Sequence, residues 1–204
     1  EAQKNGWFSD EIVPVTVTGR KGDVIVDTDE EPMKVNFDKL KTLKPAFKKD
    51  GTVTAASSSS INDGAAAIVL ASEAALTVHD CEPMARIIAQ ASFAQDPMWF
   101  TTSAVEAIKN VVAKAGLKLD DIDLFEINEA FAVVALVAKQ QLGIPREKIN
   151  VQGGAVALGH PIGASGARIL TTLLYSLKRQ GKKYGLATLC IGGGEASAVV
   201  VEMV

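Results

Sequence analysis

The 204-residue sequence contains only two cysteines, Cys81 and Cys190. Two thiols cannot form a disulfide framework or a four-thiolate zinc site, which favours a reducing, cytoplasm-like compartment and leaves the mitochondrial matrix and the peroxisome open. No apolar run reaches membrane-spanning length without a charged or turn residue, and the amino end does not have the pattern of a signal peptide. We therefore expect no membrane partner.

The sequence also lacks a strong excess of charge of either sign. With 21 Lys and Arg residues against 24 Asp and Glu residues, its net charge of -3 gives no electrostatic reason to expect a nucleic-acid partner. It contains no GxxxxGK[ST] phosphate loop, no GxGxxG fingerprint, and neither the HExxH nor the paired CxxC pattern of a metal site. Because the first residue is Glu1 rather than Met, we expect the chain to come from a longer polypeptide.

The first 55 residues are rich in Lys, Asp and Glu, and we expect them to form no core of their own. They predict short strands at residues 12–17 and 24–26 and a helical turn at residues 37–43. Residues 55–60 are small and include four serines, so they form either a flexible linker or a loop at which a ligand approaches the backbone. The apolar run at residues 65–70 predicts a buried strand or helix.

From residue 84 onward, predicted strands alternate with amphipathic helices. The strands are predicted at residues 84–93, 122–127, 149–151, 184–190 and 196–203. The helices are predicted at residues 101–115, 129–142 and 164–180. This alternation is typical of an α/β fold with a largely buried sheet.

Three polar residues, Asn128, His160 and Cys190, follow predicted strands. Ligands of open α/β sheets gather outside the carboxyl ends of the strands, so these residues form a candidate site. The second histidine, His79, lies in a predicted connector beside Asp80, and we expect no function for it.

Each of the three residues also has an ordinary structural alternative. His160 lies in a Gly-His-Pro-Ile-Gly turn that opens a helix, where it either takes part in chemistry or bonds to a backbone carbonyl. Cys190 precedes three glycines whose N–H groups could form an oxyanion site, but it could equally be a small buried hydrophobe. Asn128 is either a helix N-cap or an amide that holds a water or a carbonyl oxygen.

Three motifs resemble those of the thiolase family. They are NEAF at residues 128–131, GGAVALGHPIGASGAR at residues 153–168 and CIGGGEASA at residues 190–198. They occur in the family's order, and two further segments, DEIVPV and DGTVTAASSSSINDGAAA, also resemble thiolase segments. Among thiolases the sequence is most similar to acetyl-CoA acetyltransferases, which implies a short acyl substrate.

The resemblance implies an α/β thiolase-like fold, with a mixed five-stranded sheet flanked by helices. It implies the Claisen condensation of two acetyl-CoA molecules to acetoacetyl-CoA and CoA, or the reverse thiolysis of a 3-ketoacyl-CoA. No cofactor is implied, because the coenzyme A thioester is itself the acyl-CoA substrate. Thiolases assemble as dimers or tetramers, so a homo-oligomer is expected.

The resemblance also implies roles for individual residues. Cys190 matches the cysteine that moves the proton at the substrate's α carbon. His160 matches the histidine that helps to activate a nucleophilic cysteine and lines an oxyanion hole, in which Asn128 holds a water. Gly192 matches the backbone donor of a second oxyanion hole. The positions that match the wall of the pantetheine tunnel are Ser59, Phe47, Ala55, Ala130 and Phe131.

The sequence departs from the family because it lacks the nucleophilic cysteine's motif, which is roughly NxxC(S/A)SG. Cys81 has neither the flanking small residues nor the position. The family's layout makes residues 1–62 part of a loop domain, residues 63–83 the last elements of the amino-terminal half, and residues 84–204 the carboxy-terminal domain. We therefore expect the chain to be inactive alone and to need an amino-terminal thiolase half on the same or another chain.

Three other functions stay open. The first is a 3-ketoacyl-CoA thiolase of fatty acid β-oxidation. The second is a noncatalytic CoA-binding module, which CoA would protect against heat without turnover. The third is a cysteine hydrolase with Cys190 as the nucleophile and His160 as the base, in which alkylation by iodoacetamide would abolish hydrolysis.

Overall fold

The computed structural model describes all residues from 1 to 204. In chain order its strands and α-helices are β1 (Val15–Gly19), β2 (Gly22–Val26), α1 (Glu73–His79), β3 (Ala85–Ala94), α2 (Ser103–Lys114), β4 (Leu124–Ile127), α3 (Ala132–Leu142), α4 (Ala155–Leu158), α5 (Ser165–Gln180), β5 (Tyr184–Cys190) and β6 (Glu195–Met203). Short 3₁₀ helices occur at Glu31–Met33, Phe37–Thr42, Ala55–Ser57, Pro97–Thr102, Leu119–Asp121 and Arg146–Lys148. No helix is both long and apolar enough to cross a membrane.

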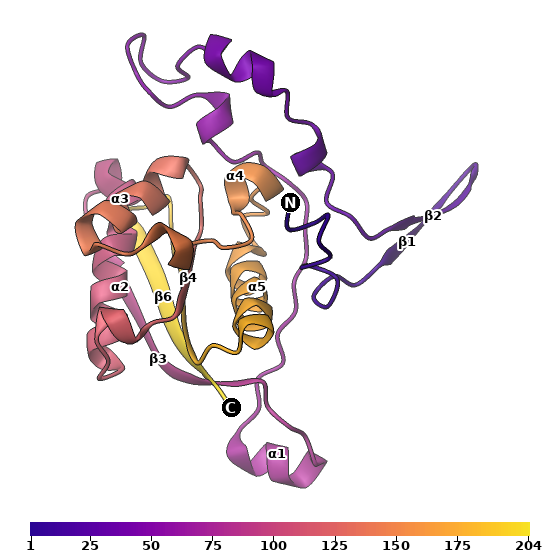
Figure 1. Ribbon diagram of the computed structural model, residues 1–204, viewed down its shortest axis with the longest axis vertical. Coiled ribbons are helices and arrows are strands. Elements are labelled where there is room, and N and C mark those ends of the chain that lie inside the picture. Colours follow the sequence, from indigo (N-terminus) through magenta and orange to yellow (C-terminus); the bar gives the residue numbers. More distant parts are fainter.

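The main sheet is mixed and has four strands in the order β3-β6-β5-β4. Strand β6 is antiparallel to both of its neighbours, whereas β4 and β5 are parallel. Helices α2 and α3 lie on one side of this sheet and α5 lies on the other (Figure 1). The α/β architecture expected from the alternating pattern is therefore confirmed.

Strand β4 shows how the sheet forms two apolar clusters. All four of its residues are buried, and successive side chains point to opposite faces. Phe125 and Ile127 join the cluster made with α2 and α3. Leu124 joins the second cluster, made with α5. The polar residue that follows, Asn128, is thereby fixed at the end of a strand that is covered on both faces.

The expected five-stranded sheet is wrong, because residues 149–151 form only a single bridge to Phe125. The side chain of Asn150 takes the place of a fifth strand. Its Oδ1 accepts from the Ile127 N–H at 2.8 Å, and its Nδ2 donates to the Ile127 carbonyl at 2.9 Å. The backbone of Asn150 has φ 45°, which turns the chain away from the sheet. The edge of β4 is thus satisfied by one amide instead of a strand.

The prediction for residues 65–70 is also wrong, because this apolar run forms neither a strand nor a helix. Val69 and Leu70 are 93% and 73% exposed. Apolar character predicts burial only where another element packs on the run, and no element of this structure does so. Helix α1, which follows this run, was not predicted. It ends at His79, and the next residue, Asp80, caps it in a left-handed conformation with φ 49°.

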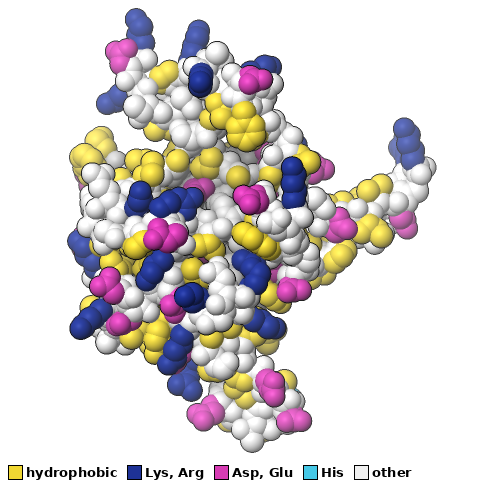
Figure 2. All heavy atoms as spheres, viewed as in Figure 1, with side chains coloured by type: hydrophobic (Ala, Val, Ile, Leu, Met, Phe, Trp, Pro, Cys, Tyr) yellow, Lys and Arg dark blue, Asp and Glu magenta, His cyan; other side chains and the backbone are white.

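The segment before residue 73 forms no core of its own, as expected, and buries only Ala2 and Phe8. Its β1–β2 hairpin projects from the body (Figure 1), and Figure 2 shows apolar side chains along it. Cross-strand pairing places Val15 opposite Val26 and Val17 opposite Val24. All ten hairpin residues are exposed, so tertiary packing does not hold this ribbon.

Candidate active site

The structure brings Asn128 and His160 into contact. Asn128 follows β4, where its backbone N–H donates to the Thr188 carbonyl of β5 at 2.9 Å. His160 lies in the turn between α4 and α5, and its Nε2 is 3.3 Å from the Asn128 Nδ2. Asn128 does not cap a helix, since Phe131 is the N-cap of α3. The amide is therefore free to face the histidine.

A half-buried carboxylate, that of Glu129, joins the two turns. Glu129 Oε1 accepts from the Nδ2 of Asn150 at 2.9 Å, and its Oε2 accepts from the N–H of Val156 at 3.1 Å. Glu129 follows Asn128 directly, while Val156 belongs to α4, the helix that leads into the turn of His160. The Glu129 side chain thus fixes the turn of Asn128 relative to the turn of His160.

The turn that carries His160 is held on both sides by backbone contacts. Gly159 has φ 92° and packs against the side chain of Asn62, so the position excludes a residue with a Cβ. The His160 N–H donates to the Ser60 carbonyl at 2.9 Å, and Ile61 forms a parallel bridge to His160. These contacts fix the turn of His160 against residues 60–62.

The imidazole is held in its neutral form. Partial burial, followed by the nearby positive charge of Arg168, lowers the pKa of His160 below its usual value. The opposite ring nitrogen, Nδ1, is 2.5 Å from the hydroxyl oxygen of Ser165. At neutral pH the ring therefore carries one proton. One ring nitrogen faces the Ser165 hydroxyl and the other faces the Asn128 amide.

Cys190 ends β5, the strand beside β4, and is buried. Burial raises the pKa of its thiol, so the protonated form is favoured at neutral pH. The thiol forms no hydrogen bond with Asn128 or His160. The structure thus places Cys190 at the end of the neighbouring strand rather than in direct contact with the pair.

The glycine turn after Cys190 leaves a backbone donor free. The Gly192 N–H donates to no backbone carbonyl, and nothing lies within 4 Å of the position a Cβ would take. Gly194, with φ 97°, packs closely on the backbone of Gln95 and Pro97. The turn is therefore anchored at Gly194 and open at Gly192.

The predicted wall residues largely come together. The Ser59 N–H and hydroxyl both donate to the Ala130 carbonyl, at 3.1 and 3.0 Å. The Phe131 ring lies 5.8 Å from that of Phe47 in an edge-to-face arrangement. Ala55, at the start of the Ala55–Ser57 helix, is exposed and makes no hydrogen bond to this group.

The linker interpretation of residues 55–60 is wrong. Ser58 forms an antiparallel bridge to Phe131, and Ser60 bonds to the turn of His160. The stretch is therefore a loop held by backbone contacts beside the candidate site, and the approach of a ligand to it stays a prediction.

Sequence reasoning missed Glu129, Asn150 and Ser165. Glu129 was visible only as part of a motif, and the left-handed backbone of Asn150 leaves no trace in the sequence. Ser165 lies five residues after His160, at the start of α5. Its only signal in the sequence was a hydroxyl side chain five residues after a histidine.

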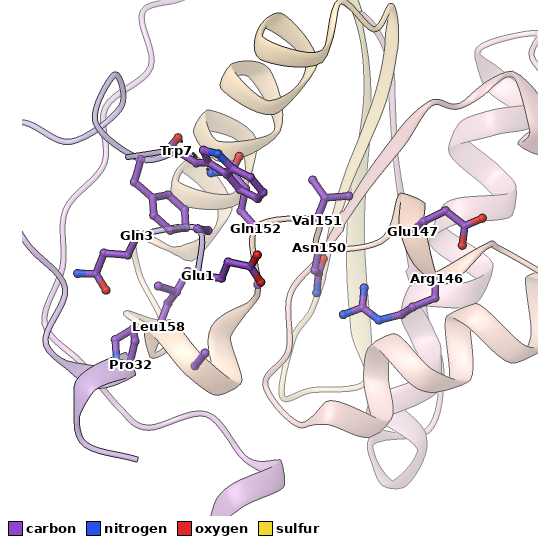
Figure 3. Close-up of a pocket in the computed structure, with 14 residues that line it drawn as sticks. Glu1, Gln3, Trp7, Pro32, Arg146, Glu147, Asn150, Val151, Gln152 and Leu158 are labelled. Carbon is purple, nitrogen blue, oxygen red and sulfur yellow. Dashed lines mark hydrogen bonds between the residues drawn. The ribbon is translucent and has the colours of Figure 1, made fainter. Parts of the chain in front are cut away.

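A cavity of about 640 Å³ beside the amino end does not contain the candidate residues. Figure 3 shows that residues of the amino end, such as Trp7, face residues 146–158 across it. Asn128, His160, Cys190 and Gly192 do not line it. Asn128 and Cys190 are instead buried at the ends of β4 and β5, and His160 contacts Asn128 from the turn after α4.

Comparison with known proteins gives matches over the whole chain. Residues 81–203 match the model of the thiolase C-terminal domain, and residues 1–74 match that of the thiolase N-terminal domain. Acetyl-CoA acetyltransferase of Syntrophomonas wolfei is 49% identical over 204 residues, which cover 99% of this chain and 52% of the relative. The chain thus spans about half the length of this relative.

Solved structures agree in fold. A crystal structure of Bacillus anthracis acetyl-CoA acetyltransferase superposes with a TM-score of 0.95 at 43% identity, covering 100% of this chain and 52% of the other. Human mitochondrial 3-ketoacyl-CoA thiolase in complex with CoA superposes with a TM-score of 0.89 at 38% identity, covering 100% and 51%. Together with the three motifs, these matches show that the chain belongs to the thiolase family.

Proposed function

We propose that this chain supplies the carboxy-terminal part of a thiolase-type acyltransferase, which condenses two acetyl-CoA molecules or cleaves acetoacetyl-CoA. The observation that carries the proposal is the contact between Asn128 and His160 beside the strand end that carries Cys190. Among the solved structures, the sequence identity of 43% to an acetyl-CoA acetyltransferase, against 38% to a 3-ketoacyl-CoA thiolase, favours a short acyl group over a long one.

In this proposal the chain has three parts. Residues 1–62 belong to a loop domain, residues 63–83 complete an amino-terminal half, and residues 84–204 form the carboxy-terminal domain. The nucleophilic cysteine comes from an amino-terminal half on the same or another chain, and the complete protein is a homo-oligomer. Cys81 does not take its place, because it is exposed and follows α1, which projects from the end of the molecule opposite α3 and α4 (Figure 1).

In the thiolysis direction, the nucleophilic thiolate attacks the C3 carbonyl of the 3-ketoacyl-CoA. The bond between C2 and C3 breaks, the acyl group stays on the nucleophile, and C2 takes a proton from the Cys190 thiol. The raised pKa of Cys190 supports this role, because it keeps the donor protonated before the step. The incoming CoA thiol then returns a proton to Cys190, attacks the acyl thioester and restores the nucleophile.

Both steps place negative charge on an oxygen, which needs fixed donors. We assign one oxyanion site to His160 together with a water held by Asn128, and a second to the Gly192 N–H. The free Gly192 N–H supports the second site. The one amide end of Asn128 that has no protein partner supports the first, because it can hold the water.

The acyl-CoA substrate would approach along the pinned loop at residues 55–60. Ser59, Ala130 and Phe131 are packed together there, with the Phe47 ring against Phe131. The lysines at positions 39, 41, 44, 48 and 49 are exposed on the adjoining segment, where they can meet the phosphates of CoA.

The test is thiolysis of acetoacetyl-CoA by two proteins. One is the 204-residue chain, and the other is a fusion in which the chain replaces the matching carboxy-terminal part of the Syntrophomonas wolfei acetyl-CoA acetyltransferase. We expect turnover from the fusion and none from the chain alone. Robust cleavage by the chain alone, or a folded fusion without thiolysis, would refute the proposal. A fusion that prefers a medium-chain 3-ketoacyl-CoA would indicate the β-oxidation alternative.

A further inference from the structure

The hydroxyl of Ser165 lies within hydrogen-bond distance of two acceptors, a ring nitrogen of His160 and the carbonyl oxygen of Pro161. Its Oγ is 2.5 Å from the Nδ1 of His160 and 3.0 Å from the Pro161 carbonyl oxygen. A serine hydroxyl has a single proton, so it can donate to only one of these two acceptors. The choice decides which nitrogen of His160 carries the imidazole proton.

The Pro161 carbonyl already has two donors. The backbone N–H groups of Ala164 and Ser165 both donate to it at 2.8 Å. A carbonyl oxygen has two lone pairs, which these amides occupy at shorter range than the hydroxyl. The hydroxyl proton of Ser165 is therefore directed to the nearer acceptor, Nδ1 of His160.

We infer that Ser165 is a positioning residue that fixes His160 in the tautomer with the proton on Nε2. This rests on the proposed function only for its catalytic meaning, because the tautomer itself follows from the contacts of His160. With Nδ1 as an acceptor, the neutral ring must carry its proton on Nε2. His160 is thus held at rest as a hydrogen-bond donor, which is the form that an oxyanion site needs.

Asn128 fits this tautomer after a half-turn of its amide. Its Oδ1 is buried without a partner in the present orientation, while Nδ2 faces the His160 Nε2. Exchange of the two amide ends lets Oδ1 accept from Nε2–H and leaves an N–H of Asn128 free. The free amide donor then lies beside the Nε2–H, which Asn128 Oδ1 accepts at rest.

The experiment uses the chain labelled with ¹⁵N-histidine, and it requires no catalysis. The chain has only two histidines, so the imidazole spectrum contains His160 and His79, and a His79→Gln variant assigns them. Long-range ¹⁵N–¹H correlation at neutral pH reports which ring nitrogen carries the proton. We expect His160 to show a protonated Nε2 and an unprotonated Nδ1, whereas exposed His79 shows fast exchange between tautomers. A protonated Nδ1 in His160 would overturn the inference.

Variants separate positioning from general stability. Ser165→Ala should convert His160 to a mixture of tautomers, while Ser176→Ala, which removes another buried hydroxyl from α5, should leave the His160 pattern unchanged. Retention of a pure Nε2–H tautomer in Ser165→Ala would also overturn the inference. If Ser165→Ala fails to fold, the spectrum of the unmodified chain still decides.

In the active fusion, Ser165→Ala should lower kcat about tenfold or more with little change in KM. The reason is that the His160 Nε2–H would no longer be fixed as a donor, and this donor acts on the oxyanion of the transition state rather than on the bound substrate. Unchanged kcat combined with the expected tautomer would reject the catalytic meaning and keep the positioning role. An inactive fusion combined with the expected tautomer would refute the proposed function alone.

Discussion

At the scale of single residues, the site depends on contacts that only one residue type can make. Gly154 is buried, and a Cβ at this position would overlap the carboxylate of Glu129, the side chain that joins the turns of Asn128 and His160. Much of the precision of the site therefore comes from residues that take no part in chemistry.

Gly154→Ala should destabilise the chain by about 1–3 kcal/mol, because the added methyl must displace Glu129 from its two hydrogen bonds. Gly163→Ala is the matched control, since nothing lies within 4 Å of its Cβ position. Urea unfolding of both variants checks this. Equal midpoints for the two variants would contradict the account of Glu129.

Glu129→Gln should remove one of the two acceptors and leave either the Val156 N–H or the Asn150 amide without a partner. We expect a loss of about 1–3 kcal/mol in the free energy of unfolding. The control is Glu82→Gln, which makes the same change at an exposed position. A loss no larger than that of the control would show that the carboxylate does not hold the turns.

At the scale of elements, the sheet edge at β4 is completed by a side chain. Asn150 bonds to both backbone groups of Ile127, which explains why a pattern that predicted a fifth strand produced only a bridge.

Asn150→Ala should therefore increase hydrogen exchange at the Ile127 amide and destabilise the chain by about 1–3 kcal/mol. Asn110→Ala, at an exposed position of α2, should change neither quantity. Unchanged protection of the Ile127 amide in Asn150→Ala would contradict this.

The face of β4 toward α5 carries a buried carboxyl group. Burial raises the pKa of Glu126 to about 8, and the attraction of Arg168, 3.9 Å away, does not offset this. The neighbouring carboxyl groups of Glu11 and Glu129 raise the pKa further. Burial likewise raises the pKa of Glu11 to about 7.

These shifts predict a stability that falls as the pH rises. Between the ordinary carboxyl pKa and about 8, the folded chain keeps a proton on Glu126 that the unfolded chain releases. The folded state therefore loses on the order of 5 kcal/mol across this window. Glu126→Gln should flatten the profile, most clearly above the pKa of Glu11. The measurement is urea unfolding from about pH 5 to about pH 8. A variant whose profile is as steep as that of the unmodified chain would contradict the assignment.

At the scale of the whole molecule, the strands and longer helices after residue 84 were predictable, apart from residues 149–151 and α4, because each buries apolar side chains at the spacing of its own secondary structure. Asn128 and Cys190 were placed at strand ends for the same reason. His160 was not, because it follows α4 and the strand predicted before it does not form. The run at residues 65–70 was mispredicted because its burial depends on contacts that this chain does not make. The roles of Glu129 and Ser165 could not be predicted, because they depend on contacts across distant turns.

The central claim is that Cys190 transfers a proton and does not carry the acyl group. The most direct test is Cys190→Ala in the active fusion, supplied with acetyl-CoA labelled in the acetyl group. We predict that the variant still forms the labelled acyl-enzyme but loses thiolysis of acetoacetyl-CoA by about 10²-fold or more, as expected when a general acid is removed. Loss of the acyl-enzyme, or thiolysis at the rate of the unmodified fusion, would contradict the account.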